Sequence, residues 1–311
     1  MYNPEIKGRF IKEYSTKDSI RTICLKTFNK LEPFEESWGA DFCTQKEEVI
    51  LPALNAILGA RAEGQRTRST ILREYVKWCM ANGIPGACDS MYHVDTTRDI
   101  SKIREQTVKN PAHLQRLLDG ICLPVESNTV DIIIRGFVWL AYSGIAEEDI
   151  FKILDSDIDF ANMVIHYQDR DYLIYREAIP ALTQCVKLQT FTVYHPNYAV
   201  PMAAPRVGGH QLLRGTKSDA SLKNMKAILS KRMKENKASD TNYLKLSYHR
   251  IWLSGVFYRM HEQELAGIPP DFSGIAEERM GDKEYSNKAY NRHRLAKSFM
   301  TDYQRWKQSL L

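Results

Sequence analysis

The chain has 311 residues, enough for two domains with separate cores, and a net charge of +5. Its composition, 43% hydrophobic and 26% charged, is ordinary for a soluble globular protein, and no run of about 18 apolar residues predicts a membrane span. The polar N-terminus does not read as a signal peptide, and six scattered cysteines without a Cys-x-x-Cys motif predict reduced thiols in a cytoplasmic protein, with no metal site and no cofactor.

The first hundred residues predict a small all-helical unit. Apolar residues recur at helical spacing from Ser69 to Asn82, and Gly83 ends that pattern as a C-terminal glycine does. Two further helices are expected from Glu47 to Leu58 and from Lys17 to Lys30. The polar stretch from Asp89 to Pro111 is the expected linker, so the domains are predicted to be residues 1–100 and 110–311.

The second domain is predicted to combine helices with one small sheet. A strongly apolar helix is expected from Thr129 to Tyr142, followed by another from Glu147 to Leu154. Two runs of β-branched and aromatic residues flank a polar turn and, with Ile158–Phe160, predict an antiparallel sheet; they are Met163–Tyr167 and Tyr172–Arg176. Beyond the sheet we expect an irregular stretch from His195 to Gly215 and helices at Ala181–Thr190, Ser218–Lys234, Ser247–Glu264 and Asn287–Leu310.

Positive charge gathers in both halves of the chain. The stretch from Arg214 to Lys237 has eight Lys or Arg against two acids, and the stretch from Lys7 to Lys30 has seven against two. Such patches suit a protein that wraps a polyanion, and the alternative interpretation of each is a solvated helix face. The candidate DNA-binding side chains are Arg61, Arg66, Arg68, Arg170, Arg214, Lys217, Lys223 and Lys226.

One stretch carries a motif. Ser143, Gly144 and Ile145 precede Ala146, and an acid, Asp149, follows three residues later, with an Asp-Ile pair at 157–158. This run resembles the first catalytic box of the tyrosine recombinase (phage integrase) family, in which Thr or Ser, Gly, an apolar residue, Arg, two variable residues and an acid follow in this order. Ala146 stands where that family has a phosphate-binding arginine.

The resemblance implies a mainly α fold. Its first part would be a helical N-terminal core-binding (SAM-like) domain that clamps DNA, and its second an α+β catalytic-type domain with a small antiparallel β-sheet. In that family a tyrosine attacks the phosphodiester, two arginines hold the phosphate, a hairpin lysine protonates the leaving oxygen, and histidines support the phosphate. The hairpin of this chain carries Arg170 and no lysine between Tyr167 and Tyr175.

A second run, from Leu246 to Phe257, resembles the second box of the family, His-x-x-Arg. Aligning Arg250 with that arginine places Ser247 at the histidine. The competing register places His249 at the histidine and Trp252 at the arginine. We prefer the first register because it keeps the downstream helix face in phase.

The remaining elements are a Leu-Gly-His motif and the nucleophile. The run from Arg279 to Asp282 resembles the motif, with Asp282 replacing the histidine. Tyr290 lies close to the expected place of the nucleophile, and Tyr285 and Tyr303 are the alternatives.

The resemblance implies a bacterial, cytoplasmic and nucleoid-associated DNA-binding protein from a phage or mobile element. With so many catalytic positions altered, we expect it to be impaired or inactive in strand cleavage and to act architecturally or as a regulator in recombination or integration. If it is active, Arg250 and Tyr290 would be catalytic residues of a site-specific recombinase with a rearranged pocket. A helical protein-interaction module without DNA binding is the third hypothesis. The expected partner is double-stranded DNA, with self-association through the C-terminal helix and no membrane contact.

Overall fold

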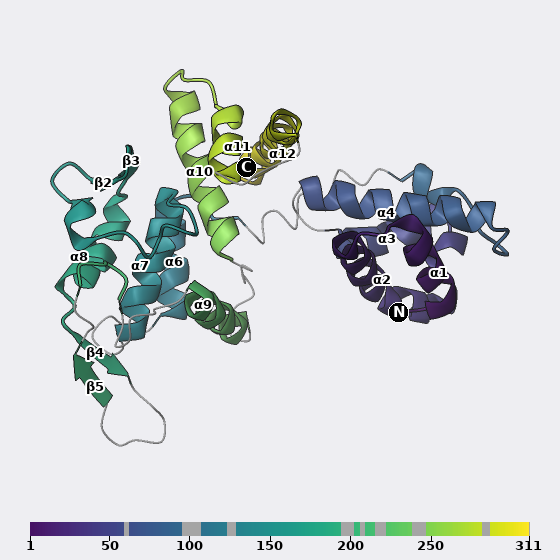
Figure 1. Cartoon of the computed structure of the whole chain (residues 1–311), viewed down its shortest axis with the longest axis horizontal. Helices are drawn as coiled ribbons and strands as arrows, with labels where there is room; N and C mark the ends of the chain where they lie inside the picture. The colour runs from purple at the N-terminus through teal and green to yellow at the C-terminus, as the bar shows by residue number, and fades with distance from the viewer. Residues whose placement is uncertain are drawn as a thin grey trace. The chain divides into compact units, whose positions relative to one another are not determined.

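The computed structural model describes residues 1–58, 62–94, 107–122, 129–193, 202–205, 209–214, 222–237, 247–281 and 287–310 (Figure 1). The chain divides into two compact units. The first is Met1–Ile103 with Lys297–Arg305, and the second is Arg104–Ala296 with Trp306–Leu311. The described elements are mainly helices, together with one three-stranded antiparallel sheet and one two-stranded sheet. This composition confirms the predicted mainly α fold class.

The first unit is a cluster of helices, as predicted. They are α1 (Pro4–Tyr14), α2 (Asp18–Trp38), α3 (Glu47–Ile57) and α4 (Ala62–Ala81), with the 3₁₀ turns η1 (Phe42–Thr44) and η2 (Ser90–Tyr92). Sequence reasoning missed α1. The buried residues of this helix are Lys7, Phe10 and Ile11, at helical spacing, so a lysine occupies one position of its inward stripe and hides the pattern.

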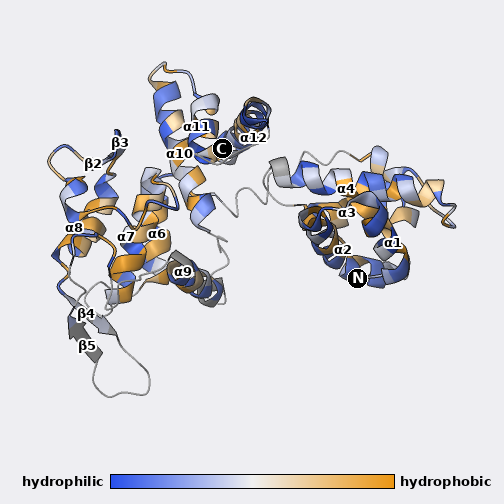
Figure 2. Ribbon diagram, viewed as in Figure 1, coloured by the Kyte–Doolittle hydropathy of each residue, from blue (hydrophilic) through white to orange (hydrophobic). Residues whose placement is uncertain are grey.

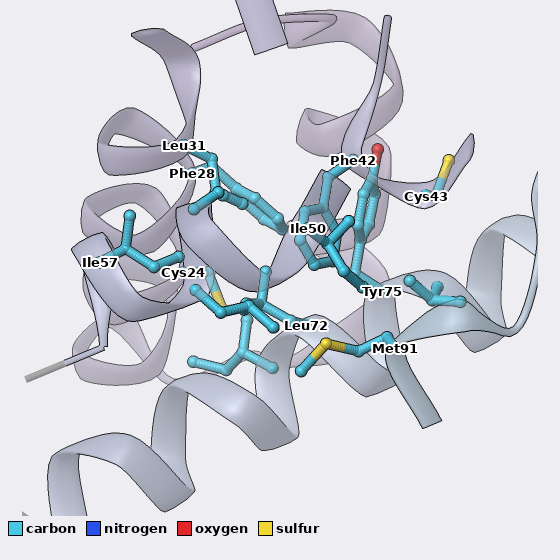
Figure 3. Close-up of a cluster of buried hydrophobic side chains, with 14 of the residues drawn as sticks. Cys24, Phe28, Leu31, Phe42, Cys43, Ile50, Ile57, Leu72, Tyr75 and Met91 are labelled. Carbon is cyan, nitrogen blue, oxygen red and sulfur yellow. The ribbon is translucent and has the colours of Figure 1, made fainter. Parts of the chain in front are cut away.

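Aromatic and aliphatic side chains from the helices of the first unit form its core (Figure 3). The rings of Phe28 and Tyr75 pack edge to face at 4.9 Å, and Phe10 packs on Tyr75 at 5.2 Å. Such ring pairs stabilise a core beyond the apolar area that they bury. Tyr75 lies within the apolar pattern predicted from Ser69 to Asn82, and its side chain is fully buried.

A buried ionic network lies at one side of this core. The ammonium of Lys7 lies 2.5 Å from each carboxylate oxygen of Glu35 and 3.6 Å from Asp41, and all three side chains are buried. The Tyr75 hydroxyl donates to both oxygens of Asp41 at 3.0 Å, and the Phe42 amide donates to Glu35 at 2.9 Å. Since buried charges are tolerated only when paired and hydrogen-bonded, each of these groups depends on the others.

The second unit is organised around α7 (Thr129–Ser143). Every residue of α7 from 131 to 143 is buried, and Figure 2 shows this helix as predominantly hydrophobic. The other helices of the unit are α6 (Pro111–Ile121), α8 (Ile179–Lys187), α9 (Leu222–Lys237), α10 (Tyr248–Leu265), α11 (Phe272–Met280) and the start of α12 (Lys288–Leu310). The start of α6 fell inside the predicted linker. Pro111 is its first residue, where its missing N–H costs nothing, and Asn110 caps it by accepting from the His113 amide.

The predicted antiparallel sheet is present, but its third strand lies earlier in the sequence than expected. Its strands, in order, are β1 (Ile158–Asp159), β2 (Val164–Tyr167) and β3 (Arg170–Leu173), whereas the third strand was expected at Tyr172–Arg176. The hairpin turn is only two residues long because Gln168 adopts a φ of 53°, and Tyr167 therefore pairs directly with Arg170. Residues 176–178 form a 3₁₀ turn, η4 (Arg176–Ala178), that leads into α8.

Two further predictions about the second unit are wrong. No helix forms from Glu147 to Leu154, because the backbone at its end bonds to residues 210–212 instead: Asp155 donates to His210, and Leu212 donates to Ile153. A strand pair lies partly in the stretch predicted to be irregular, with β4 (Thr190–Val193) antiparallel to β5 (Met202–Pro205).

Candidate nucleic-acid interface

The two motif-bearing segments meet where α10 packs across the end of α7. The last carbonyls of a helix have no partner within it. Here the Tyr248 hydroxyl donates to Ile145 at 2.5 Å, the Trp252 indole donates to Gly144 at 2.9 Å, and the Arg259 guanidinium donates to Tyr142 at 2.9 Å. Residues 248, 252 and 259 share one face of α10, so this face satisfies one carbonyl at the end of α7 and those of the two residues that follow the helix.

An arginine does lie beside the first motif, but it is not the one that the family pattern supplies. Gly144 adopts a φ of 103°, and a Cβ built there would lie 2.3 Å from Nη2 of Arg259. The Arg259 guanidinium therefore occupies the space next to Gly144, and its hydrogen bond to the Tyr142 carbonyl directs it at the backbone. Nothing in the sequence around position 259 signals this role.

A cavity of about 440 Å³ opens between α9 and the start of α10. Three cationic side chains line it, Lys226, Lys234 and Arg250, against one carboxylate, Glu147, which follows directly after Ala146. The α9 residues that line it recur at helical spacing and so share one face of the helix; they are Lys226, Leu229, Ser230, Met233 and Lys234. The structure thus brings two of the predicted site residues, Lys226 and Arg250, into one cationic hollow.

The start of α10 adds partial positive charge to this cavity. Ser247, Tyr248, His249 and Arg250 all line it, and the first N–H groups of a helix have no partner within the helix. A helix N-terminus that adjoins lysine and arginine side chains is a recurrent arrangement for binding phosphate. The geometry can therefore hold a phosphodiester oxygen without any catalytic group.

The negative charge in the cavity is partly neutralised. Glu147 forms an ion pair with Lys226. Burial raises the pKa of the Tyr248 hydroxyl, the Glu147 carboxylate raises it further, and the positive charge of Arg279 lowers it. Tyr248 is thus a neutral hydrogen-bond donor to Ile145 and is not available as a phenolate nucleophile.

The other predicted DNA-binding arginines of the second unit are engaged within the fold. Arg170 of the hairpin lies 3.3 Å from Glu278, and Arg214 lies 2.8 Å from Asp155. In the first unit, Arg68 donates to the Ile57 carbonyl at 2.7 Å, whereas Arg66 is exposed on α4. Arg61, Lys217 and the side chain of Lys223 lie outside the described residues.

The candidate nucleophiles differ in exposure. Tyr290 is 62% exposed in the first turn of α12, and it is not among the described residues that line the cavity between α9 and α10. Tyr303 is fully buried, and Tyr285 and Asp282 lie outside the described residues. Of the two registers for the second box, the first places its arginine, Arg250, in the cavity wall, while Trp252 of the second is buried against Gly144.

All six cysteines are free, and five of them are buried. Among the described residues, no group of three or more His, Cys, Asp or Glu side chains is arranged to hold a metal ion. Within the same part of the chain, no helix has the length and apolar character needed to cross a membrane.

Comparisons with known proteins find one matching family model, in the first unit, and a similar solved structure. Residues 1–81 match the family model described as "MrpR, N-terminal core-binding domain". Among solved structures, the chain is similar to that described as "Crystal structure of XerA recombinase", with 11% identity over 94% of this chain and 92% of that chain, at a TM-score of 0.38. None of the curated proteins matches the chain. The first unit is therefore similar to a core-binding domain over most of its helical part.

Proposed function

We propose that this chain is a tyrosine-recombinase-like protein that binds double-stranded DNA without cleaving it, with an architectural or regulatory role in recombination or integration. The observation that carries the proposal is the cavity between α9 and α10. There, three cations and a helix N-terminus face one carboxylate beside the position where the recombinase pattern would place an arginine.

The arrangement supports binding more than catalysis. Ala146 offers no group to a phosphate, and the Arg259 guanidinium near it is held by a backbone carbonyl. Loss of one preorganised donor to the charge of a transition state costs about 10² to 10³ in rate. The hairpin, where the recombinase pattern has a general-acid lysine, carries Arg170 instead. Arg170 pairs with Glu278, and a guanidinium is a poor proton donor.

Binding is tested with a fluorescein-labelled 30-base-pair duplex of mixed sequence. We expect the logarithm of the binding constant to fall linearly with the logarithm of salt concentration between about 50 and 200 mM. Arg250→Ala and Lys234→Ala should each lower the magnitude of the slope by about one. Lys231→Ala is the matched control, since this exposed α9 residue does not line the cavity.

If the chain binds DNA but neither Arg250→Ala nor Lys234→Ala changes the slope of the salt dependence, the cavity does not contact the DNA. No binding at about 50 mM salt would overturn the proposal and favour the protein-interaction module. Cleavage is tested separately with a nicked suicide substrate, on which we expect no covalent protein–DNA adduct. An adduct that forms in the native chain and is lost in Tyr290→Phe would establish the alternative, a working recombinase with a rearranged pocket.

A further inference from the structure

A second cavity in the same unit, of about 640 Å³, has a different character from the cationic one. It lies beside α10, near η4 and the end of β3, and its wall includes Tyr175, Tyr258, Glu177 and Glu262. Cavities of roughly 300 to 1,000 Å³ are the size range of small-molecule sites. None of the motifs discussed above, and none of the predicted site residues, falls in this wall.

The inner wall is aromatic. The rings of Tyr175 and Tyr258 meet edge to face at 5.9 Å, and behind them Tyr142 packs on Tyr175 at 5.1 Å. Tyr175 is only 7% exposed, and the Arg259 guanidinium lies beside its hydroxyl: burial raises the pKa of that hydroxyl, and the charge and hydrogen bonding of Arg259 lower it.

The rim is acidic. Burial raises the pKa of the Tyr258 hydroxyl, and the carboxylates of Glu262 and then Glu177 raise it further, which places both carboxylates near this ring. No ion pair is recorded for Glu177 or Glu262 in the described part of the chain. Glu262 is exposed, so the carboxylates stand between the tyrosine rings and solvent.

The wall also contains one cation, Arg259, and the start of α6. The Arg259 guanidinium is bound to the Tyr142 carbonyl, and its charge, with that of Arg170, lowers the pKa of Glu278, which burial raises. Its charge is therefore shared with a carboxylate outside the cavity. At the start of α6 the Asn110 side chain already accepts from the His113 amide, and Pro111 has no N–H to offer.

We propose that this cavity binds a small organic cation, an alkylammonium or polyamine, seated against the partly exposed ring of Tyr258 with its charge between Glu177 and Glu262. Rings that present negative faces together with carboxylates form the usual setting for organic ammonium groups. The proposal is independent of DNA binding, because no wall residue is shared with the cationic cavity between α9 and α10.

The test is calorimetric titration of the full chain with choline and, separately, with spermidine. We expect saturable binding of at least one of them, weakened about tenfold or more by Tyr258→Leu and by Glu262→Gln. Glu264→Gln is the matched control: it removes the same charge from the same helix, does not line the cavity, and should leave affinity within about twofold.

Thermal unfolding of each variant checks that it is folded. Because Glu262 is exposed, Glu262→Gln should disturb the fold less than Tyr258→Leu. Absence of saturable binding of both cations at millimolar concentration would overturn the proposal. So would equal weakening by Glu262→Gln and Glu264→Gln, which would mean diffuse attraction by the acidic helix. Binding of acetate or phosphate in place of the cations would assign the cavity to an anion held by Arg259 and overturn it as well.

Discussion

The backbones of α10 and α7 approach closely at Gly255, and this approach gives a sharp prediction for Gly255→Ala. A Cβ at position 255 would lie 1.9 Å from the carbonyl oxygen of Tyr142 and 2.7 Å from its carbonyl carbon. Comfortable contact needs about 3.5 Å, so the two helices must separate by more than an ångström. That separation would also break the hydrogen bonds from Trp252 to Gly144 and from Arg259 to Tyr142.

The magnitude follows from these parts. Overpacking of a core costs about 1–3 kcal/mol, and each lost hydrogen bond costs about 0.5–1.5 kcal/mol. The higher helix propensity of Ala over Gly returns about 1 kcal/mol. The free energy of unfolding of the second unit should therefore fall by roughly 1–5 kcal/mol.

Urea denaturation gives the change in stability, and hydrogen exchange read by mass spectrometry assigns it to α7 and α10. Gly8→Ala is the matched control: it too lies within a helix, and nothing lies within 4 Å of its Cβ position, so it should be neutral or stabilise by up to about 1 kcal/mol. Gly255→Ala with native stability and unchanged exchange of α7 and α10 would refute the close approach.

Two further predictions concern charged groups. Lys7→Met should destabilise the first unit by about 3–5 kcal/mol, because it leaves Glu35 and Asp41 buried without their cation. The control, Lys12→Met at an exposed position of the same helix, should change the free energy of unfolding by no more than about 0.5 kcal/mol. Equal urea midpoints for the two variants would contradict the buried network. The pKa of His166 is raised above 6.5, first by its hydrogen bond to Asp171 at 2.7 Å, so its stabilisation is present below pH 6.5 and lost as the pH rises through the raised value. An NMR titration should show a lower pKa for His166 in Asp171→Asn, and an unchanged pKa would count against that contact.

Much of the fold could be predicted because it follows from periodic apolar residues. The pattern of α7 and the alternation in β2 are local properties of the chain, and both elements were predicted. The errors arose where distant partners decide the structure. Residues 147–154 read as a helix, yet their final backbone groups bond to residues 210–212, and α1 was hidden by a lysine that is buried only because Glu35 receives it.

The site was less accessible to sequence reasoning, because a basic residue does not reveal its partner. Lys226 and Arg250 were singled out and do line one cavity, whereas Arg259 attracted no attention and lies beside Gly144. Its role depends on α10 crossing the end of α7, which no local pattern encodes. The acidic and aromatic cavity was missed for the same reason, since its wall combines residues from three separate stretches of sequence, within 110–112, 173–177 and 258–263.

Countercharges also change what a basic stretch contributes to DNA binding. Of the cations between Arg214 and Lys237, Arg214 is paired with Asp155, Lys226 is paired with Glu147, and Arg232 lies 2.6 Å from the buried Asp131. A cation already neutralised by a carboxylate releases few counterions on binding DNA, and its removal would uncover that carboxylate. The salt slope of the second unit should therefore be well below the eight that the sequence count suggests. A slope of eight, with each basic residue contributing about one, would mean that these ion pairs open on DNA.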